Sequence, residues 1–447
     1  MMYAVMIGQL ILSLSILVIL HEMGHFFPAR WFNTRVEKFY LFFDPWFSLF
    51  KIKRGDTEYG IGWLPLGGYV KISGMIDESM DLEQMKQPAQ PWEFRSKPAW
   101  QRLIIMLGGV TVNFILGFFL YAMVLWVWGE EYLPASEAKY GISVDSIGME
   151  LGLRDGDKIL EVGGRPFEKF NDKLVLREIV INNANTMKVE RDGAVVTLPI
   201  DAKYSSVLSS SKFKDTPLFL PRMPFEIGKL IKDMPAEKAG LLEKDKILAV
   251  NDIPTAYFSD FSKQVKSHKN EDITISVLRN NLDTVRVALR TTEQGMVGVA
   301  PFGPDHYFNT KRQDYSLLQA LPMGVTKGTR FLGDQMKAFG QMFKGRIKAS
   351  ESLGGFASIG KMFGYQWDWE RFWTMTAVLS LILGFMNLLP IPALDGGHVV
   401  FLLYEVVTRR KPSDKVLEYS TTAGFFLLMS LLLYANGLDV VRAIFGK

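Results

Sequence analysis

The residues best suited to chemistry stand near the start of the chain, where the sequence reads His21-Glu22-Met23-Gly24-His25. Two histidines four residues apart share one face of a helix and can bind one metal ion there. The adjacent Glu22 can take a proton from a water held at that metal. Imidazole and carboxylate ligands suit zinc, which in catalytic sites keeps one position open for water. The pattern therefore predicts the zinc site of a metalloprotease.

The setting of this motif strengthens the prediction. Residues 6–20, immediately before it, are almost wholly apolar, so the motif stands at or near membrane depth, where ionisable groups are costly and usually functional. The alternative is a chance HExxH string on a soluble helix. Because the chain has only five histidines and two of them fall here, we favour the metalloprotease interpretation.

Composition limits the class of protein. The chain of 447 residues combines 22% charged residues with a positive mean hydropathy, which indicates membrane spans joined to sizeable water-exposed domains. The formal charge is only +4, without a dense basic run, which argues against a nucleic-acid partner. Cysteine is absent, so disulfides and thiolate ligands are excluded and histidine and carboxylate ligands remain.

Four runs are long enough to cross a bilayer, which takes about 20 apolar residues. We expect these spans within residues 1–28, 100–129, 372–405 and 417–438. The first carries the metal motif and lacks the features of a cleaved signal peptide, so we expect it to be retained. The predicted fold class is a polytopic α-helical membrane protein with four transmembrane helices.

Lysine and arginine near the span ends predict the orientation. They are frequent in the connections 29–99 and 406–416, which we therefore place in the cytoplasm. By alternation, residues 130–371 and the tail 439–447 lie outside, where a long domain can cross regardless of its charge.

The first cytoplasmic connection contains an apolar, glycine-rich segment at about residues 58–75. A turn signal at Gly67-Gly68 separates two strand-like pieces, which predicts a β-hairpin. Because the segment is apolar but too short to span, we expect it to re-enter the membrane beside the helices. The alternative is a surface hairpin packed on the cytoplasmic face.

The outer segment contains an internal repeat. Residues 152–162 recur as residues 240–250 at a constant offset of 88, and strand-like alternation follows each copy. Two small β-rich modules are therefore predicted, at 130–215 and 216–310, followed by an amphipathic helical segment at 311–371. The repeated pattern resembles the PDZ domain, which implies a groove for an extended peptide. A merely steric role is the alternative.

The third span carries a second polar cluster. Pro390 and Pro392 break its helix, and Asp395 follows within an Asp-Gly-Gly sequence. At 1.5 Å per helical residue, the two histidines lie about 26–32 Å along span one and Asp395 about 35 Å along span three. Asp395 is therefore our predicted third ligand. His398 competes for that role.

With these motifs together, the chain resembles the site-2 protease family, specifically its RseP-type members from Gram-negative bacteria. The resemblance covers essentially the full chain and is carried by HEMGH, the LPLGGYVKI hairpin, QRLIIMLGGVTVNF, the tandem PDZ-like modules and NLLPIPALDGGH. It implies an intramembrane zinc metalloprotease. The implied zinc ligands are His21, His25 and Asp395, and the implied general base is Glu22.

The resemblance also implies residues for substrate binding. Asn387 matches a polar residue near the substrate, and Asn113 matches the asparagine of the family's second-span motif. The hairpin matches a membrane re-entrant β-loop, so we expect Gly67, Gly68 and Tyr69 to meet a locally unwound substrate by strand addition.

Substrates and location follow from the same resemblance. We expect single-pass membrane proteins of the anti-sigma factor type, already trimmed by another protease, and remnant signal peptides. The PDZ-like modules would act as a size filter in the periplasm. The protein would reside in the lipid bilayer of the bacterial inner membrane, with its active site towards the cytoplasm.

Four positions depart from the family pattern. Phe42 and Asp44 stand where relatives usually have a Gly-x-Gly pair, and Val110 and Phe356 each replace a proline. These changes leave the predicted metal ligands intact. Two other classes of function remain as alternatives: a PDZ-bearing adaptor without catalysis, disfavoured by the intact Glu22, and a metal transporter, disfavoured by ligands clustered on one side.

Overall fold

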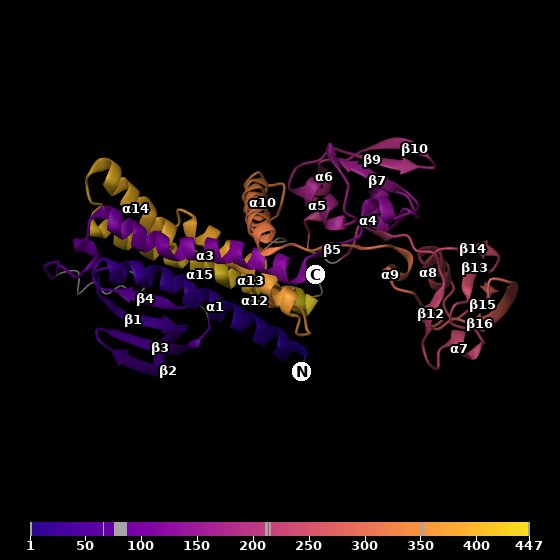
Figure 1. Cartoon of the computed structure of the whole chain (residues 1–447), viewed down its shortest axis with the longest axis horizontal. Coiled ribbons are helices and arrows are strands. Elements are labelled where there is room, and N and C mark those ends of the chain that lie inside the picture. The colour runs from indigo at the N-terminus through magenta and orange to yellow at the C-terminus, as the bar shows by residue number, and fades with distance from the viewer. Residues whose placement is uncertain are drawn as a thin grey trace. The chain divides into compact units, whose positions relative to one another are not determined.

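The computed structural model describes residues 2–65, 67–75, 87–210, 213, 216–348, 350 and 353–445. Leu66 in the predicted hairpin, and residues 76–86 in the predicted cytoplasmic segment, lie outside the described residues. The chain divides into two compact units (Figure 1). Unit 1 comprises Met1–Gly129, Asp314–Met336 and Leu353–Lys447, and unit 2 comprises Glu130–Gln313 and Lys337–Ser352.

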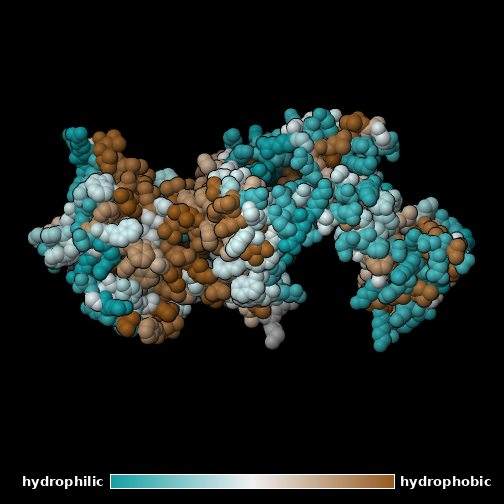
Figure 2. All heavy atoms as spheres, viewed as in Figure 1, coloured by the Kyte–Doolittle hydropathy of each residue, from teal (hydrophilic) through white to brown (hydrophobic). Residues whose placement is uncertain are grey.

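Within the described residues, unit 1 contains four helices that are long and apolar enough to cross a membrane, which agrees with the predicted number. They are α1 (Met2–Trp31), α3 (Ala99–Trp128), α13 (Trp369–Leu388) and α15 (Asp414–Phe445). Figure 2 shows a largely hydrophobic surface over these helices, as expected where lipid replaces water. The last helix continues to Phe445, beyond the predicted end of the span at Leu438.

Helix α3 is the scaffold of unit 1, because it packs against α1, α13 and α14 (Asp395–Thr408). Ile105 and Met106 on α3 are buried in one core cluster with Val399 of α14. Glycines let α1 and α3 approach closely: a Cβ on Gly24 would lie 2.5 Å from the carbonyl oxygen of Gly108. The α1–α3 crossing therefore lies inside the HExxH motif itself.

A four-stranded sheet lies beside α1 (Figure 1). Its strands are β1 (Val36–Leu41), β2 (Phe43–Arg54), β3 (Thr57–Leu64) and β4 (Tyr69–Ile72), in the order β2-β3-β1-β4. Strand β1 pairs with β3 in parallel and with β4 antiparallel. The outer strands β2 and β4 form the edges of this sheet.

The predicted pairing of a hairpin around Gly67-Gly68 is wrong. Both strand-like pieces are strands, but β3 and β4 lie on opposite sides of β1. The hairpin of this sheet is formed instead by β2 and β3, which are joined by the two-residue turn Gly55-Asp56. The turn signal at Gly67-Gly68 is local, whereas the pairing is decided by β1, whose Val36 and Tyr40 are buried.

The two departures in this region have visible structural consequences. Phe42 adopts φ = 67°, a left-handed conformation that favours glycine. Asp44 accepts a hydrogen bond of 2.9 Å from the hydroxyl of Tyr69 and another of 2.9 Å from Ser48. The ring of Tyr69 stacks on Tyr40 at 5.3 Å. Asp44 thus ties the edge strand β4 to the start of β2.

Unit 2 contains two modules with the same sheet topology. The first sheet has the order β10-β9-β7-β8, and the second β16-β15-β13-β14. The strands of the first are β7 (Lys158–Val162), β8 (Arg165–Pro166), β9 (Thr186–Arg191) and β10 (Ala194–Pro199). Those of the second are β13 (Lys246–Val250), β14 (Ile253–Pro254), β15 (Asp272–Arg279) and β16 (Asp283–Arg290). Matching strand orders support the predicted repeat.

Further short strands complete the modules. They pair as β5 (Glu130–Tyr132) with β18 (Lys311–Gln313), β6 (Ile142–Val144) with β11 (Phe219–Pro221), and β12 (Ile227–Leu230) with β17 (Val299–Pro301). The helices of this unit include α4 (Ser146–Glu150), α5 (Asp172–Val180), α6 (Lys203–Leu208), α7 (Pro235–Lys238), α8 (Phe258–Ser267) and α9 (Pro304–Tyr307). Because β11 pairs with β6, the boundary between the modules lies after Pro221 rather than at the predicted 215.

The repeat extends to one ion pair in each module, formed by a buried aspartate and a partly buried arginine. Arg191 pairs with Asp157, and Arg279, 88 residues later, pairs with Asp245 in the same way. Hydrogen bonding to these carboxylates raises the pKa of both arginines. Neither arginine was predicted, although Arg191 and Arg279 are separated by the offset of the repeat.

The predicted helical segment after the modules contains α10 (Leu317–Phe343) and α12 (Phe356–Phe363). The start of α12 is held by the last turns of α15. Asp439 accepts a hydrogen bond of 2.9 Å from the backbone N–H of Ser358, and Asn436 accepts one of 3.1 Å from that of Phe356. The helical end beyond Leu438 therefore packs on α12.

Candidate metal centre

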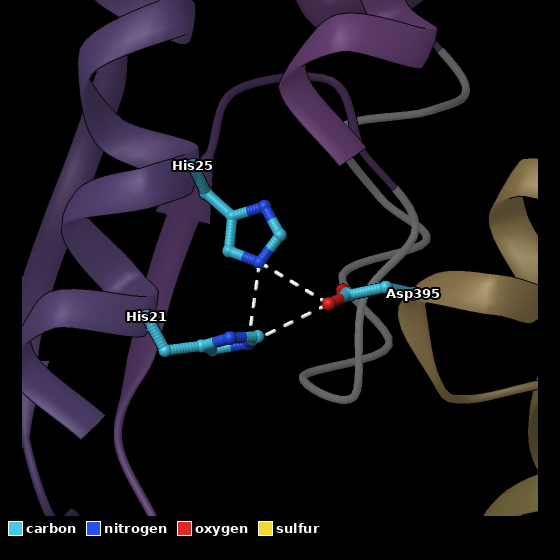
Figure 3. A group of neighbouring side chains, drawn as sticks. All are labelled: His21, His25 and Asp395. Carbon is cyan, nitrogen blue, oxygen red and sulfur yellow. Dashed lines mark hydrogen bonds and ion pairs between the residues drawn. The ribbon is translucent and has the colours of Figure 1, made fainter. Parts of the chain in front are cut away.

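Two helices bring three potential ligands together (Figure 3). Helix α1 supplies His21 and His25 one turn apart, and the first residue of α14 is Asp395. Oδ2 of Asp395 lies 3.5 Å from Nε2 of His21 and 3.4 Å from Nε2 of His25. The two Nε2 atoms are 3.4 Å apart. The three atoms therefore form a nearly equilateral triangle.

This triangle fits a zinc ion. Bonds of about 2.1 Å in a tetrahedral zinc site give ligand-to-ligand distances of about 3.4 Å, which the three measured separations match. Oδ2 of Asp395 is buried and receives no hydrogen bond from any described residue, so this oxygen is available to bind a metal. Two imidazoles and one carboxylate leave a fourth position open, as in catalytic zinc sites.

The break in the third span determines where Asp395 lies. The helix stops at Leu388 and restarts at Asp395, across the prolines at 390 and 392. Gly396 and Gly397 make the restart possible, because a Cβ on Gly397 would lie 2.6 Å from the carbonyl oxygen of Ile391. Asp395 thus occupies the first turn of α14, where the helix dipole favours a negative charge.

His398, the competing third ligand, is not part of the cluster that the described residues form. It lies one turn beyond Asp395 on α14. The geometry therefore brings Asp395, rather than His398, to the two histidines.

Helix α3 contacts the other nitrogen of each histidine. Nδ1 of His25 lies 2.8 Å from the carbonyl oxygen of Ile105, an arrangement that keeps the proton on Nδ1 and leaves Nε2 for a metal. Nδ1 of His21 lies 2.9 Å from Nδ2 of Asn113. Between these positions, Gly109 leaves room for both rings, because a Cβ there would lie 2.6 Å from Cε1 of His21.

Asn113 was predicted to contact the substrate, but the structure places its side chain elsewhere. Its side chain is fully buried between helices and faces His21. The buried position suits an orienting role for the histidine. Two further residues at the site were not predicted from the sequence: Ile105, which acts through its backbone carbonyl, and Gly109, which acts by having no side chain. The sequence feature that could have indicated them is the Gly108-Gly109 pair within an apolar helix.

The other predicted site residues differ in how directly they contact the three ligands. Nδ2 of Asn387 lies 3.3 Å from Nε2 of His21, within reach of a group bound there. Glu22 is buried, and a Cβ on Gly68 would lie 3.6 Å from its Cγ. The start of β4 thus approaches the carboxylate. Tyr69 turns its hydroxyl to Asp44, and Gly67 adopts φ = 147°, which only glycine tolerates well.

Comparison with known proteins is consistent with this geometry. Residues 9–431 match Peptidase family M50. The chain is similar to the regulator of sigma E protease of Haemophilus influenzae, with 30% identity over 456 residues that cover 98% of each chain. It is also similar to a protein named as a zinc metalloprotease in Neisseria meningitidis, at 30% identity over 97% of this chain and 98% of the relative. Protease RseP of Yersinia pestis is 28% identical over 95% of this chain and 96% of the relative.

Proposed function

Because the chain belongs to peptidase family M50 and is an intramembrane zinc metalloprotease, we propose that its zinc ion is held by His21, His25 and Asp395. The observation that carries this proposal is the triangle of 3.4–3.5 Å between their ligand atoms. When bound there, zinc supplies Lewis-acid polarisation of the scissile carbonyl and makes the attacking water more acidic.

Glu22 is the proposed general base. It follows the first ligand on α1 and is buried, and a carboxylate next to a metal ligand can accept the proton of the attacking water and deliver it to the leaving amine. Asn387 donates from Nδ2 and can hydrogen-bond the oxyanion or the substrate backbone. Ile105 and Asn113 hold the imidazoles of the ligands in place from behind.

Strand β4 is the proposed docking edge for substrate. A transmembrane helix hides its carbonyls in its own hydrogen bonds, so it must unwind before attack. An edge strand offers replacement main-chain hydrogen bonds to an unwound segment. Strand β4 is an edge of its sheet, contacts α1, and directly follows Gly68, which lies beside the side chain of Glu22; these positions support the assignment.

We further propose that the sheet enters the membrane from the cytoplasmic side. Strand β2 exposes a run of apolar side chains, including Trp46, Phe47 and Phe50, and ends in the basic residues Lys53 and Arg54. Such a pattern suits burial of the apolar part in lipid with the charges at the headgroups.

The chain contains no cysteine, so single cysteines introduced at exposed positions of unit 1 and unit 2 would report, by labelling in intact cells, on which side of the membrane each unit lies. Labelling of unit 2 only after permeabilisation of the inner membrane would refute this orientation.

The substrates proposed are single-pass membrane proteins of the anti-sigma factor type after a first cleavage, together with remnant signal peptides. One relative is named as a regulator of sigma E protease, which supports this class of substrate.

The two modules of unit 2 have the matching topology of a tandem repeat. They are proposed to be periplasmic PDZ domains that exclude substrates with large external domains.

The experiment that tests the catalytic proposal separates zinc binding from chemistry. Glu22→Gln should retain zinc at wild-type stoichiometry but lose cleavage of a tagged transmembrane substrate, because glutamine cannot accept the proton. Asp395→Ala, which removes the ligand oxygen, should lose zinc as well as activity. Full cleavage by Glu22→Gln with zinc present would exclude Glu22 as the base, and retained zinc in Asp395→Ala would exclude Asp395 as a ligand.

A further inference from the structure

A buried ion pair joins helix α14 to helix α3, ten residues after Asp395. Nη2 of Arg102 donates a hydrogen bond of 2.5 Å to Oε1 of Glu405, and the two side chains are only 9% and 13% exposed. Nε of Arg102 donates to the carbonyl oxygen of Lys97 at 2.9 Å, and the guanidinium lies 5.9 Å from the ring centroid of Phe94. The guanidinium is therefore fixed before it meets Glu405.

Both partners lie on helix faces that also serve the metal centre. On α14, the residues at spacings of four, seven and ten from Asp395 are Val399, Leu402 and Glu405, so one face begins at the carboxylate and ends at the ion pair. On α3, the corresponding stripe runs from Arg102 through Ile105 and Gly109 to Asn113. One stripe of α3 thus contacts His25, His21 and α14.

Helix α14 packs mainly on α3, so its position depends on that contact. The break at residues 389–394 separates it from α13, and it ends at Thr408. Its contact with α3 also includes the apolar side chains of Val399 and Leu402, and apolar contact alone tolerates small slips and rotations. A buried ion pair resists such slips, because a shifted register would leave a buried charge without its partner. A rotation of α14 would carry Asp395 away from the histidines.

We propose that Arg102 and Glu405 are positioning residues that fix the register of α14 on α3 and thereby hold Asp395 at the correct distance from His21 and His25. The inference rests on the proposed role of Asp395 as a ligand. It adds two residues that act on the metal centre without touching it.

The test is a charge reversal in the full-length protein purified in detergent. Arg102→Glu and Glu405→Arg should each lose Zn²⁺ to a chelator about 10–100-fold faster than wild type, as typically follows disruption of groups that orient metal ligands. The visible absorption of the Co²⁺-loaded protein should change, and kcat should fall with KM unchanged. The double variant Arg102→Glu/Glu405→Arg should restore all three properties towards wild type, because it rebuilds the pair.

Two further variants keep the test decisive. Glu405→Gln retains a hydrogen-bond acceptor and should fold where the reversals fail, with an intermediate effect on the Co²⁺ spectrum. Asp245→Asn weakens a comparable buried pair in unit 2 and should leave the spectrum and metal retention unchanged. Wild-type spectra and metal retention in the folded single variants, or no recovery in the double variant, would overturn the inference. Retention of zinc by Asp395→Ala would instead refute the proposed ligand set, so the two failures are distinguishable.

Discussion

Nδ2 of Asn113 lies 2.9 Å from Nδ1 of His21, while the amide oxygen of Asn113 is buried without a hydrogen-bond partner among the described residues. Nε2 of His21 faces Asp395 and His25. When Nε2 binds a metal, Nδ1 must carry the proton and needs an acceptor. Rotation of the amide by half a turn supplies the unpartnered oxygen as that acceptor, so Asn113 can serve the metal-bound histidine.

Substitution of Asn113 tests this relationship. Asn113→Leu removes the acceptor while keeping the volume, and we expect zinc affinity to fall by about 10–100-fold, as for other residues that orient metal-bound histidines. Asn113→Asp keeps an acceptor and should bind zinc better than the leucine variant. Zinc affinity is measured by competition with a chelator.

Ser13 provides a matched control for Asn113. Its hydroxyl lies 2.9 Å from that of Thr376, buried in the same helical bundle but away from the triangle. Ser13→Ala should lower the free energy of unfolding by about 1 kcal/mol, the usual contribution of one hydrogen bond. Its zinc affinity should be unchanged. An equal loss of zinc affinity in Ser13→Ala and Asn113→Leu would show that Asn113 acts only through the fold.

The parts of the site that the sequence predicted are those governed by local spacing. His21 and His25 face one way because they are four residues apart on a helix, and the level of Asp395 follows from helical rise. The pairing of Arg102 with Glu405 joins residues 303 positions apart and depends on how α14 rotates after the proline break. No spacing rule predicts that rotation.

The sheet shows the same limit. The strands around Gly67-Gly68 were recognisable from apolar pattern and glycine, but their neighbour in space is β1, which precedes both in the sequence. In the repeat, by contrast, the offset of 88 relates the ion pair Arg191–Asp157 to the ion pair Arg279–Asp245, because a repeated sequence repeats its long-range contacts.

The close crossing of α1 and α3 predicts a strong effect at Gly24. A Cβ there would lie 2.5 Å from the carbonyl oxygen of Gly108, and backbone cannot yield as a side chain can. Gly24→Ala should therefore cost about 1–3 kcal/mol of stability through overpacking and separate the ligands from α3, with loss of zinc. Thermal unfolding in detergent and metal analysis measure these effects.

Gly8 on the same helix is the control for Gly24. A Cβ on Gly8 would meet no heavy atom of the described residues within 4 Å. Alanine is the better helix former by about 1 kcal/mol, so Gly8→Ala should keep zinc and activity and leave stability equal or higher. If Gly24→Ala behaved like Gly8→Ala, the close crossing would not matter for the site.

Gly68 offers a way to disturb substrate docking without removing zinc. A Cβ at this position would lie 2.5 Å from both the carbonyl oxygen of Tyr40 and Cγ1 of Val18, so Gly68→Ala should displace the start of β4 from Glu22. We expect cleavage to fall at least about tenfold, equivalent to about 1.4 kcal/mol in the transition state, with zinc stoichiometry unchanged. Gly55→Asn, in the β2–β3 turn at φ = 64°, is compatible with a left-handed conformation and should cleave normally.

The ion pair of the second module predicts an effect confined to unit 2. Asp245→Ala leaves Arg279 without its partner, which should cost about 3 kcal/mol, at the lower end for a broken buried pair because the arginine is 23% exposed. Hydrogen exchange should rise in β13 and β15, while zinc content and cleavage of a trimmed substrate stay unchanged.

The pH dependence of this pair follows from the raised pKa of Arg279. A raised pKa stabilises the folded module at pH values below the pKa of the unfolded state, and this stability is lost only as the pH rises through the pKa of the folded state. The contribution of the arginine should therefore be constant up to strongly alkaline pH.

If the second module filters substrates by size, Asp245→Ala should also increase cleavage of a substrate that retains a folded external domain, relative to the trimmed one. An unchanged ratio of the two cleavage rates, with the module demonstrably loosened, would argue against a filter in the second module.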